Sequence, residues 1–292
     1  MTRAPSIDRL VAAELALPVE PAARAMAEAI AAQYPGAARA VLFYGSCLRE
    51  KQLDGLMLDF YLIVSDYRAA FGRGWKSFAN RVLPPNVFPF ALDKLVAKYA
   101  VLSEADFHRL NGPEAGDVSV WARFAQPSRL VWASDEAARE KAVEAVARAA
   151  PTLIGYARPM ADSGAEPLDL FRRGFELTYA SELRAERKGR SGSIVDDDPE
   201  RYREFGAAAL PLAHAPADAA ASWRRFRRRG KALTLARLAK ATTTYAGGVD
   251  YIVWKINRHA GTAIEVKPWQ RRFPILGALV MLPRLWRRGA IR

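Results

Sequence analysis

The chain has 292 residues, of which 51% are hydrophobic and 26% charged, proportions typical of a globular protein with a sizeable core. A single cysteine excludes an intramolecular disulfide and a cysteine-rich metal site, and three histidines argue against a zinc centre. The net charge of +13, from 44 basic against 31 acidic residues, predicts an anionic partner: a nucleotide, a nucleic acid or an acidic lipid.

The N-terminal segment is predicted to form two helices. Pro18 and Pro21 divide the helical stretch Ser6–Ala32, and the second helix, Ala22–Gln33, is expected to end before Pro35-Gly36. No uninterrupted apolar core follows the first charged residues, so we expect no signal peptide. These features favour a cytoplasmic protein.

Residues 41–66 (VLFYGSCLREKQLDGLMLDFYLIVSD) carry the most informative pattern, which is two apolar strands joined by a loop. The first strand, Val41–Tyr44, ends at Gly45-Ser46. The second, Leu56–Val64, is a near-continuous apolar run that contains one carboxylate, Asp59. Such a run is typical of a strand buried on both faces. An ionised carboxylate there is costly unless a cation or hydrogen bonds meet it.

A strand, a Gly-Ser turn and a carboxylate on the next strand form the layout of a nucleotidyltransferase core. Gly45 would let the backbone turn sharply and approach a phosphate, and the Ser46 hydroxyl with nearby N–H groups would hold the β- and γ-phosphates. Asp59 would hold Mg²⁺, which prefers oxygen ligands and shares them with substrate phosphates. The competing interpretation is a structural carboxylate satisfied by an arginine or by N–H groups.

Three blocks, in order, cover roughly residues 40–130 and resemble one family. They are Tyr44-Gly45-Ser46 with Leu58-Asp59-Phe60 a dozen residues later, then Lys98–Ser103 (KYAVLS), then Trp121–Phe124 (WARF) with Gln126-Pro127-Ser128. This pattern resembles the mitochondrial translocator assembly and maintenance protein family. Its members are soluble-type phosphatidate cytidylyltransferases that make CDP-diacylglycerol from CTP and phosphatidic acid.

The resemblance implies an α+β fold: a polymerase-β-like mixed sheet with flanking helices, plus a mostly helical, winged-helix-like second domain. It also implies Mg²⁺ as cofactor, held by Asp59, with CTP and phosphatidic acid as partners. The residues that it implicates are Asp59 and Lys98 in catalysis, and Tyr44, Gly45, Ser46, Lys98 and Tyr99 in nucleotide binding. Many nucleotidyltransferases have a second carboxylate where this chain has Tyr61, whereas the family that it resembles has an apolar residue there. The chain departs from that family at Cys47 and Ala100, where the family usually has glycine.

Between the second strand and residue 102 we expect a helix over Tyr67–Ala79 with Trp75 and Phe78 in the core, then a proline-punctuated loop over Leu83–Pro89. A third strand, Asp93–Leu102, would carry Lys98. This lysine either neutralises triphosphate charge or is a solvated lysine on an edge strand. Asp93 is either a further metal ligand or a turn residue.

The remaining helices are predicted from capping and apolar spacing. They are Ser103–Leu110 with a capping box, Val118–Phe124, Asp135–Ala150 with Ser134 as N-cap, Pro167–Arg187, and Pro199–Phe205. Pro151 is expected to begin a new unit. Asp196–Asp198 either cap the last of these helices or bind Mg²⁺, and the cap is favoured. The predicted division is a core over 1–133, a helical domain over 134–212 and a basic C-terminal region over 213–292.

The C-terminal region combines positive charge with aromatic and apolar residues. Residues 223–231 (WRRFRRRGK) hold six cations and two aromatics, which suits nucleic acid or an anionic bilayer, and a helix is expected over Leu233–Ile256. The apolar stretch 273–283 is too short to span a bilayer. Its flanking residues are the predicted membrane contacts: Arg271, Arg272, Trp286, Arg287 and Arg288. The alternative is that this segment docks on the protein's own core.

These features combine into one functional prediction: a Mg²⁺-dependent phosphatidate cytidylyltransferase, cytoplasmic and peripheral on the inner face of the cell membrane. Nucleic acid is a less favoured partner. The alternatives are a nucleotidyltransferase that acts on RNA or protein, and a catalytically inactive, membrane-bound scaffold.

Overall fold

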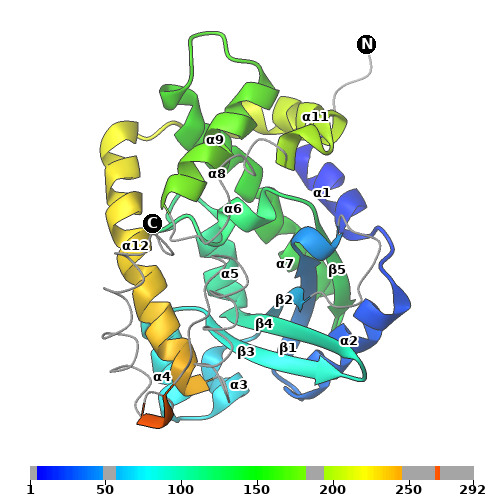
Figure 1. Ribbon diagram of the computed structural model, residues 1–292. Helices are drawn as coiled ribbons and strands as arrows, with labels where there is room; N and C mark the ends of the chain where they lie inside the picture. Colours follow the sequence, from blue (N-terminus) through cyan, green and yellow to red (C-terminus); the bar gives the residue numbers. More distant parts are fainter. Residues whose placement is uncertain (1–4, 49–56, 182–193, 245–266, 270–292) are drawn as a thin grey trace.

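The computed structural model describes residues 5–48, 57–181, 194–244 and 267–269 (Figure 1). At its centre lies a five-stranded mixed sheet in the order β3-β4-β2-β1-β5, in which β2 and β4 are parallel and every other neighbouring pair is antiparallel. The strands are β1 (Ala38–Tyr44), β2 (Met57–Val64), β3 (Asn86–Leu92), β4 (Leu95–Ser103) and β5 (Ser128–Ala133). The predicted α+β class, a mixed sheet flanked by helices, is confirmed.

Helices cover both faces of the sheet (Figure 1). One face packs against α2 (Pro21–Ala32) and α3 (Tyr67–Phe71), with α4 (Trp75–Val82) beside α3 and β3. The other face belongs to the larger core. Its helices are α1 (Ile7–Leu15), α5 (Glu104–Asn111), α6 (Trp121–Phe124), α7 (Glu136–Ala147), α8 (Ala149–Ala157), α9 (Pro167–Ser181), α11 (Pro199–Ala209) and α12 (Ala219–Thr244).

The apolar run of β2 follows from this two-sided cover. Successive strand residues point to opposite faces, so Phe60 and Leu62 enter the core under α2, whereas Tyr61 and Ile63 enter the larger core. The expectation of a strand buried on both faces is therefore confirmed. By the same alternation, Asp59 shares the face of Tyr61.

The predicted helix over Tyr67–Ala79 is wrong because two helices occupy this stretch. Asp66 caps α3 by accepting from the backbone N–H groups of Arg68 and Ala69 at 2.7 and 2.9 Å. The helix ends at Gly72, whose φ of +67° a residue with a side chain rarely adopts. Phe78, on α4, is 70% exposed, so the prediction that it lies in the core is wrong.

The segment predicted as a proline-rich loop forms most of β3. This strand lies at the edge of the sheet, where Pro89 stands opposite Lys98 on β4. An edge strand tolerates proline because the missing N–H need not pair with a second neighbour. The expectation that this segment is not a central strand is confirmed, and the loop assignment holds for residues 83–85 and is wrong from Asn86 onward. The other edge strand, β5, was not anticipated.

Helix caps explain most of the remaining boundaries. Ser103 accepts from the N–H of Asp106 at 3.2 Å and starts α5 as predicted. Asp135, not Ser134, caps α7 by accepting from the N–H of Ala138 at 2.8 Å. Pro151 lies in the first turn of α8, where a proline costs no intrahelical hydrogen bond, and the expectation that a new unit begins there stays a prediction.

The acidic run before α11 acts as a cap and an ion pair. Asp198 accepts from the N–H of Arg201 at 3.2 Å, so the cap interpretation is confirmed, and α11 extends beyond the predicted end to Ala209. Asp196 forms an ion pair with Arg172 on α9 at 2.7 Å. The predicted division at residue 134 remains a prediction, although the larger core contains residues from both sides of it.

The basic and aromatic stretch 223–231 lies within α12, which begins before the predicted helix. Trp223 and Phe226 are fully buried against Trp121 and Tyr156, and the indole N–H of Trp223 donates to the carbonyl of Tyr156 at 3.0 Å. The interpretation of these two rings as surface contacts is therefore wrong. Arg271, Arg272, Trp286, Arg287 and Arg288 lie outside the described residues. Within the part of the chain that is described, no helix combines the length and apolar character needed to cross a membrane.

Candidate functional site

The candidate site lies at one end of the sheet, where β1 ends and β2, β4 and β5 begin. Tyr44, the last residue of β1, stands opposite Asp59 on β2 and opposite Ser128 on β5. Asp59 in turn stands opposite Lys98 on β4. The parallel pairing of β2 with β4 therefore brings together residues that are far apart in the sequence.

Gly45 lies directly against the carboxylate of Asp59. Its φ is +97°, and a Cβ atom at this position would stand 3.1 Å from Oδ2 of Asp59. A side chain here would both strain the backbone and press on the carboxylate. Ser46 begins a short 3₁₀ helix, Ser46–Leu48, and its side chain is outside the described part of the structure. Cys47 donates its thiol to the carbonyl of Met57 at 3.4 Å, which ties this turn to β2.

Asp59 and Lys98 form an ion pair, with Nζ 2.9 Å from Oδ1. Their side chains are 21% and 29% exposed, so water screens the pair only in part. Oδ1 is buried, and apart from this ion pair it meets no hydrogen-bond donor among the described residues. The competing interpretation of Asp59, a structural carboxylate, expected an arginine or N–H groups as its partner. The partner in the structure is Lys98. Lys98 lies on an internal strand, so its interpretation as a solvated lysine on an edge strand is wrong.

Tyr44 packs beside the ion pair as a neutral phenol. Its ring centroid lies 5.2 Å from that of Tyr61 and 6.0 Å from that of Phe124. Burial raises the pKa of Tyr44 well above its ordinary value, the negative charge of Asp59 raises it further, and a hydrogen bond from the Arg123 guanidinium opposes the rise. Arg123, on α6, thus joins the site although it was not predicted as a site residue. It lies within the third sequence block of the family resemblance, which was the available signal.

Tyr99 does not join the other residues of the site. Because it follows Lys98 on the same strand, its side chain points to the opposite face of the sheet. There it is 3% exposed, and its hydroxyl lies 3.0 Å from that of Tyr34 and donates to Gln33 Oε1 at 3.3 Å. Asp93 lies exposed in the turn between β3 and β4 with a φ of 52°, so the turn interpretation is confirmed.

In the part of the site that the structure describes, one carboxylate, Asp59, is offered to a metal. Among the described residues, no group of three or more His, Cys, Asp or Glu side chains could hold a metal ion. Mg²⁺ is often bound by one or two carboxylates, with water and substrate phosphates as the other ligands. Asp59, whose buried Oδ1 meets Lys98 Nζ and no other hydrogen-bond donor among the described residues, fits that minimal role when a nucleotide supplies the remaining oxygens.

Compared with known proteins, the chain matches no family model and no curated protein. The fold therefore defines the class of this protein, α+β with a five-stranded mixed sheet between helices. Its function is inferred from the site.

Proposed function

We propose that this protein is a nucleotidyltransferase that transfers CMP from CTP to phosphatidic acid at a membrane surface, giving CDP-diacylglycerol and pyrophosphate. The observation that carries the proposal is the contact of the Gly45 turn with the Asp59–Lys98 pair at one end of the sheet. All three residues also belong to the sequence blocks that resemble phosphatidate cytidylyltransferases.

Each residue has a role that follows from its chemistry. The backbone at Gly45 would approach the triphosphate closely, and Lys98 would neutralise part of its charge. Asp59 would hold Mg²⁺, which supplies charge stabilisation to the triphosphate when bound. A phosphate oxygen of phosphatidic acid attacks the α-phosphorus of CTP, the bond to the β-phosphate oxygen breaks, and pyrophosphate leaves. The attacking phosphate is already ionised at neutral pH, so no general base is required.

A second candidate function is a catalytically inactive, membrane-bound scaffold. The observation that favours it is the ion pair itself, because Lys98 already neutralises Asp59, the carboxylate that the described residues place at the site. The second strand carboxylate of many nucleotidyltransferases is replaced by Tyr61, whose ring lies in the core. The two candidates differ in whether Asp59 is needed for chemistry or for folding alone.

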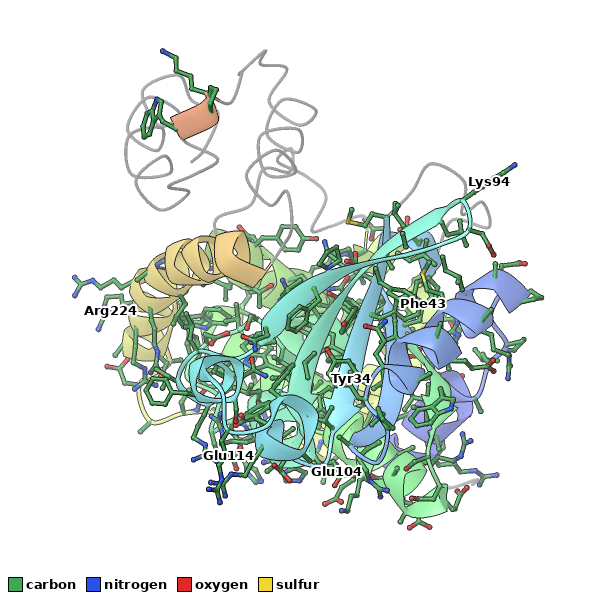
Figure 2. The ribbon with its side chains drawn as sticks, turned by 90° about the horizontal axis from the view of Figure 1, so that it is seen from below. Tyr34, Phe43, Lys94, Glu104, Glu114 and Arg224 are labelled. Carbon is green, nitrogen blue, oxygen red and sulfur yellow. The ribbon has the colours of Figure 1, made fainter. Side chains whose placement is uncertain are left out.

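The test is to incubate purified protein with labelled CTP, Mg²⁺ and vesicles that contain phosphatidic acid, and to separate labelled lipid from nucleotide. We expect labelled CDP-diacylglycerol, and a loss of about 100-fold or more in Asp59→Asn and Lys98→Gln. Lys94→Gln is the matched control, since Lys94 extends away from the protein body at the tip of the β3–β4 hairpin (Figure 2). It should keep full activity.

Other outcomes separate the alternatives. Label on added RNA or on protein would support nucleotidyl transfer to a macromolecule. An absence of transfer by protein that still binds vesicles would support the scaffold. An Asp59→Asn protein with unchanged activity would remove this carboxylate from the mechanism.

A further inference from the structure

Five exposed arginines lie on α12 without a carboxylate partner in the part of the chain that the structure describes. Arg224, Arg225, Arg227, Arg228 and Arg229 are all exposed, and none forms an ion pair with any residue that the structure describes. Some arginines on α7, α9 and α11 differ in this respect. Each of four is paired with an acid: Arg139 with Glu136, Arg172 with Asp196, Arg173 with Glu176 and Arg203 with Glu200.

The orientation of these arginines is fixed by the buried side of the helix. Trp223 and Phe226 are both 0% exposed, and the hydrogen bond of the Trp223 indole to Tyr156 holds the helix in one rotation. Arg224 and Arg228 are four residues apart, as are Arg225 and Arg229, so each pair lies on one face. With Ala221 these four arginines line an open depression of about 540 Å³, and Arg224 points away from the protein body (Figure 2).

This arrangement is unfavourable without an anionic partner. Like charges four residues apart on a helix repel each other, and the described part of the chain supplies no carboxylate to offset them. Guanidinium groups bind phosphate oxygens with paired hydrogen bonds. The open shape of the depression suits an extended array of phosphates better than a small enclosed ligand.

The buried rings narrow the choice of partner. Single-stranded nucleic acids bind proteins through basic grooves in which bases stack on exposed aromatic rings. On α12 the two rings of the basic stretch, Trp223 and Phe226, are in the core and unavailable for stacking. A lipid surface requires only the phosphates, and each basic residue near an anionic bilayer adds to the attraction.

We propose that the arginine face of α12, formed by Arg224, Arg225, Arg228 and Arg229, docks this protein on an anionic phospholipid surface through guanidinium–phosphate contacts. The rings of Trp223 and Phe226 do not enter the bilayer, because both are committed to the core. The choice of a lipid surface rests on the proposed function, whose acceptor is a membrane lipid. The anion-binding property of the face does not depend on catalysis.

The experiment is vesicle flotation of the full chain, without CTP, on vesicles with and without anionic phospholipid. The test variant carries Arg224→Gln, Arg225→Gln, Arg228→Gln and Arg229→Gln. The matched control carries Arg139→Gln, Arg172→Gln, Arg173→Gln and Arg203→Gln, which removes the same charge from arginines that already have acidic partners. We expect the test variant to lose affinity for anionic vesicles by about 100-fold or more, and the control to stay within about threefold of the parent chain.

Parent binding should also weaken as salt is raised, since exposed charges are screened. Unchanged vesicle binding by the test variant overturns the proposal, and so does an equal loss in the control. Loss of binding to a single-stranded RNA oligonucleotide with intact vesicle binding assigns the face to nucleic acid instead. If the fourfold variant does not fold, Arg224→Gln with Arg228→Gln gives the same comparison with a smaller loss. Since no CTP is present, an inactive enzyme does not affect this result.

Discussion

Gly45 and Asp59 contact each other more closely than a side chain at position 45 allows. In Gly45→Ala, both the φ of +97° and the new Cβ at 3.1 Å from the carboxylate oppose the native geometry. We expect a loss of about 1–3 kcal/mol in the free energy of unfolding, measured with urea, together with a loss of transferase activity.

Gly72→Ala is the matched control because Gly72 also has a positive φ, +67°, and a Cβ there meets nothing within 4 Å. It should lose stability through backbone strain and keep its activity. Equal activity in the two variants would contradict a functional role for the contact of Gly45 with Asp59.

Tyr67 is expected to make the free energy of unfolding depend on pH in the alkaline range. Burial raises the pKa of its phenol above the ordinary value of 10.0, and the hydrogen bond that it donates to Asp106 at 2.6 Å raises it further. Above pH 10 the unfolded chain loses this proton while the folded protein keeps it, so the stabilisation is complete below pH 10 and is lost as pH rises toward the folded pKa. We expect urea unfolding of the parent chain to lose about 1.4 kcal/mol per pH unit more than Tyr67→Phe above pH 10. Identical slopes would show that the two states bind this proton equally.

Among the residues of the site, spacing along the chain predicted Gly45, Asp59 and Lys98, because a turn and a lone polar residue in an apolar strand are local features. Tyr99 was predicted beside Lys98, but the two side chains lie on opposite faces of the sheet, because adjacent residues of a strand alternate between faces. Arg123 was missed because its contact with Tyr44 joins α6 to β1, which no local pattern encodes.

At the scale of elements, the basic and aromatic stretch of α12 could place its rings on the surface or in the core, and the structure places them in the core. Because Trp223 is fully buried and hydrogen-bonded, Trp223→Ala should cost about 3–5 kcal/mol in the free energy of unfolding. Phe78→Ala is the control, since Phe78 is 70% exposed and its loss should change stability by no more than about 0.5 kcal/mol. Both values come from urea titrations. A Trp223→Ala protein as stable as the control would contradict the burial of this ring in the core.

Elements that end at caps were predictable, and elements defined by their neighbours were not. Asp198 and Ser103 start α11 and α5 through side chains that reach their own backbone. By contrast, β3 was predicted as a loop because prolines are excluded from central strands, and its edge position depends on the strand order of the whole sheet.

At the scale of the whole molecule, one hydrophobic core spans the predicted boundary at residue 134. Tyr61 on β2 and Phe171 on α9 belong to the same cluster. An ion pair reinforces this continuity, since Glu14 on α1 accepts from Arg201 on α11 at 3.0 Å with both side chains nearly buried.

We therefore expect a single unfolding transition in urea, with tryptophan fluorescence and far-ultraviolet circular dichroism changing together. The reason is that loss of the helices after residue 134 uncovers the same core that supports the sheet. Two separate transitions would instead support the predicted division of the chain at this position.

The sequence by itself determined the features that depend on short stretches of backbone: the Gly45 turn, the two-sided burial of β2, the caps of α5 and α11, and the excess of positive charge. The tertiary structure decided which residues meet. It paired Asp59 with Lys98, placed β3 at the edge, turned Trp223 into the core and left five arginines of α12 without an ion pair to any described residue. The physical reason is that dihedral preference, alternation and capping act over a few residues, whereas strand order and helix packing join residues that are distant in the chain.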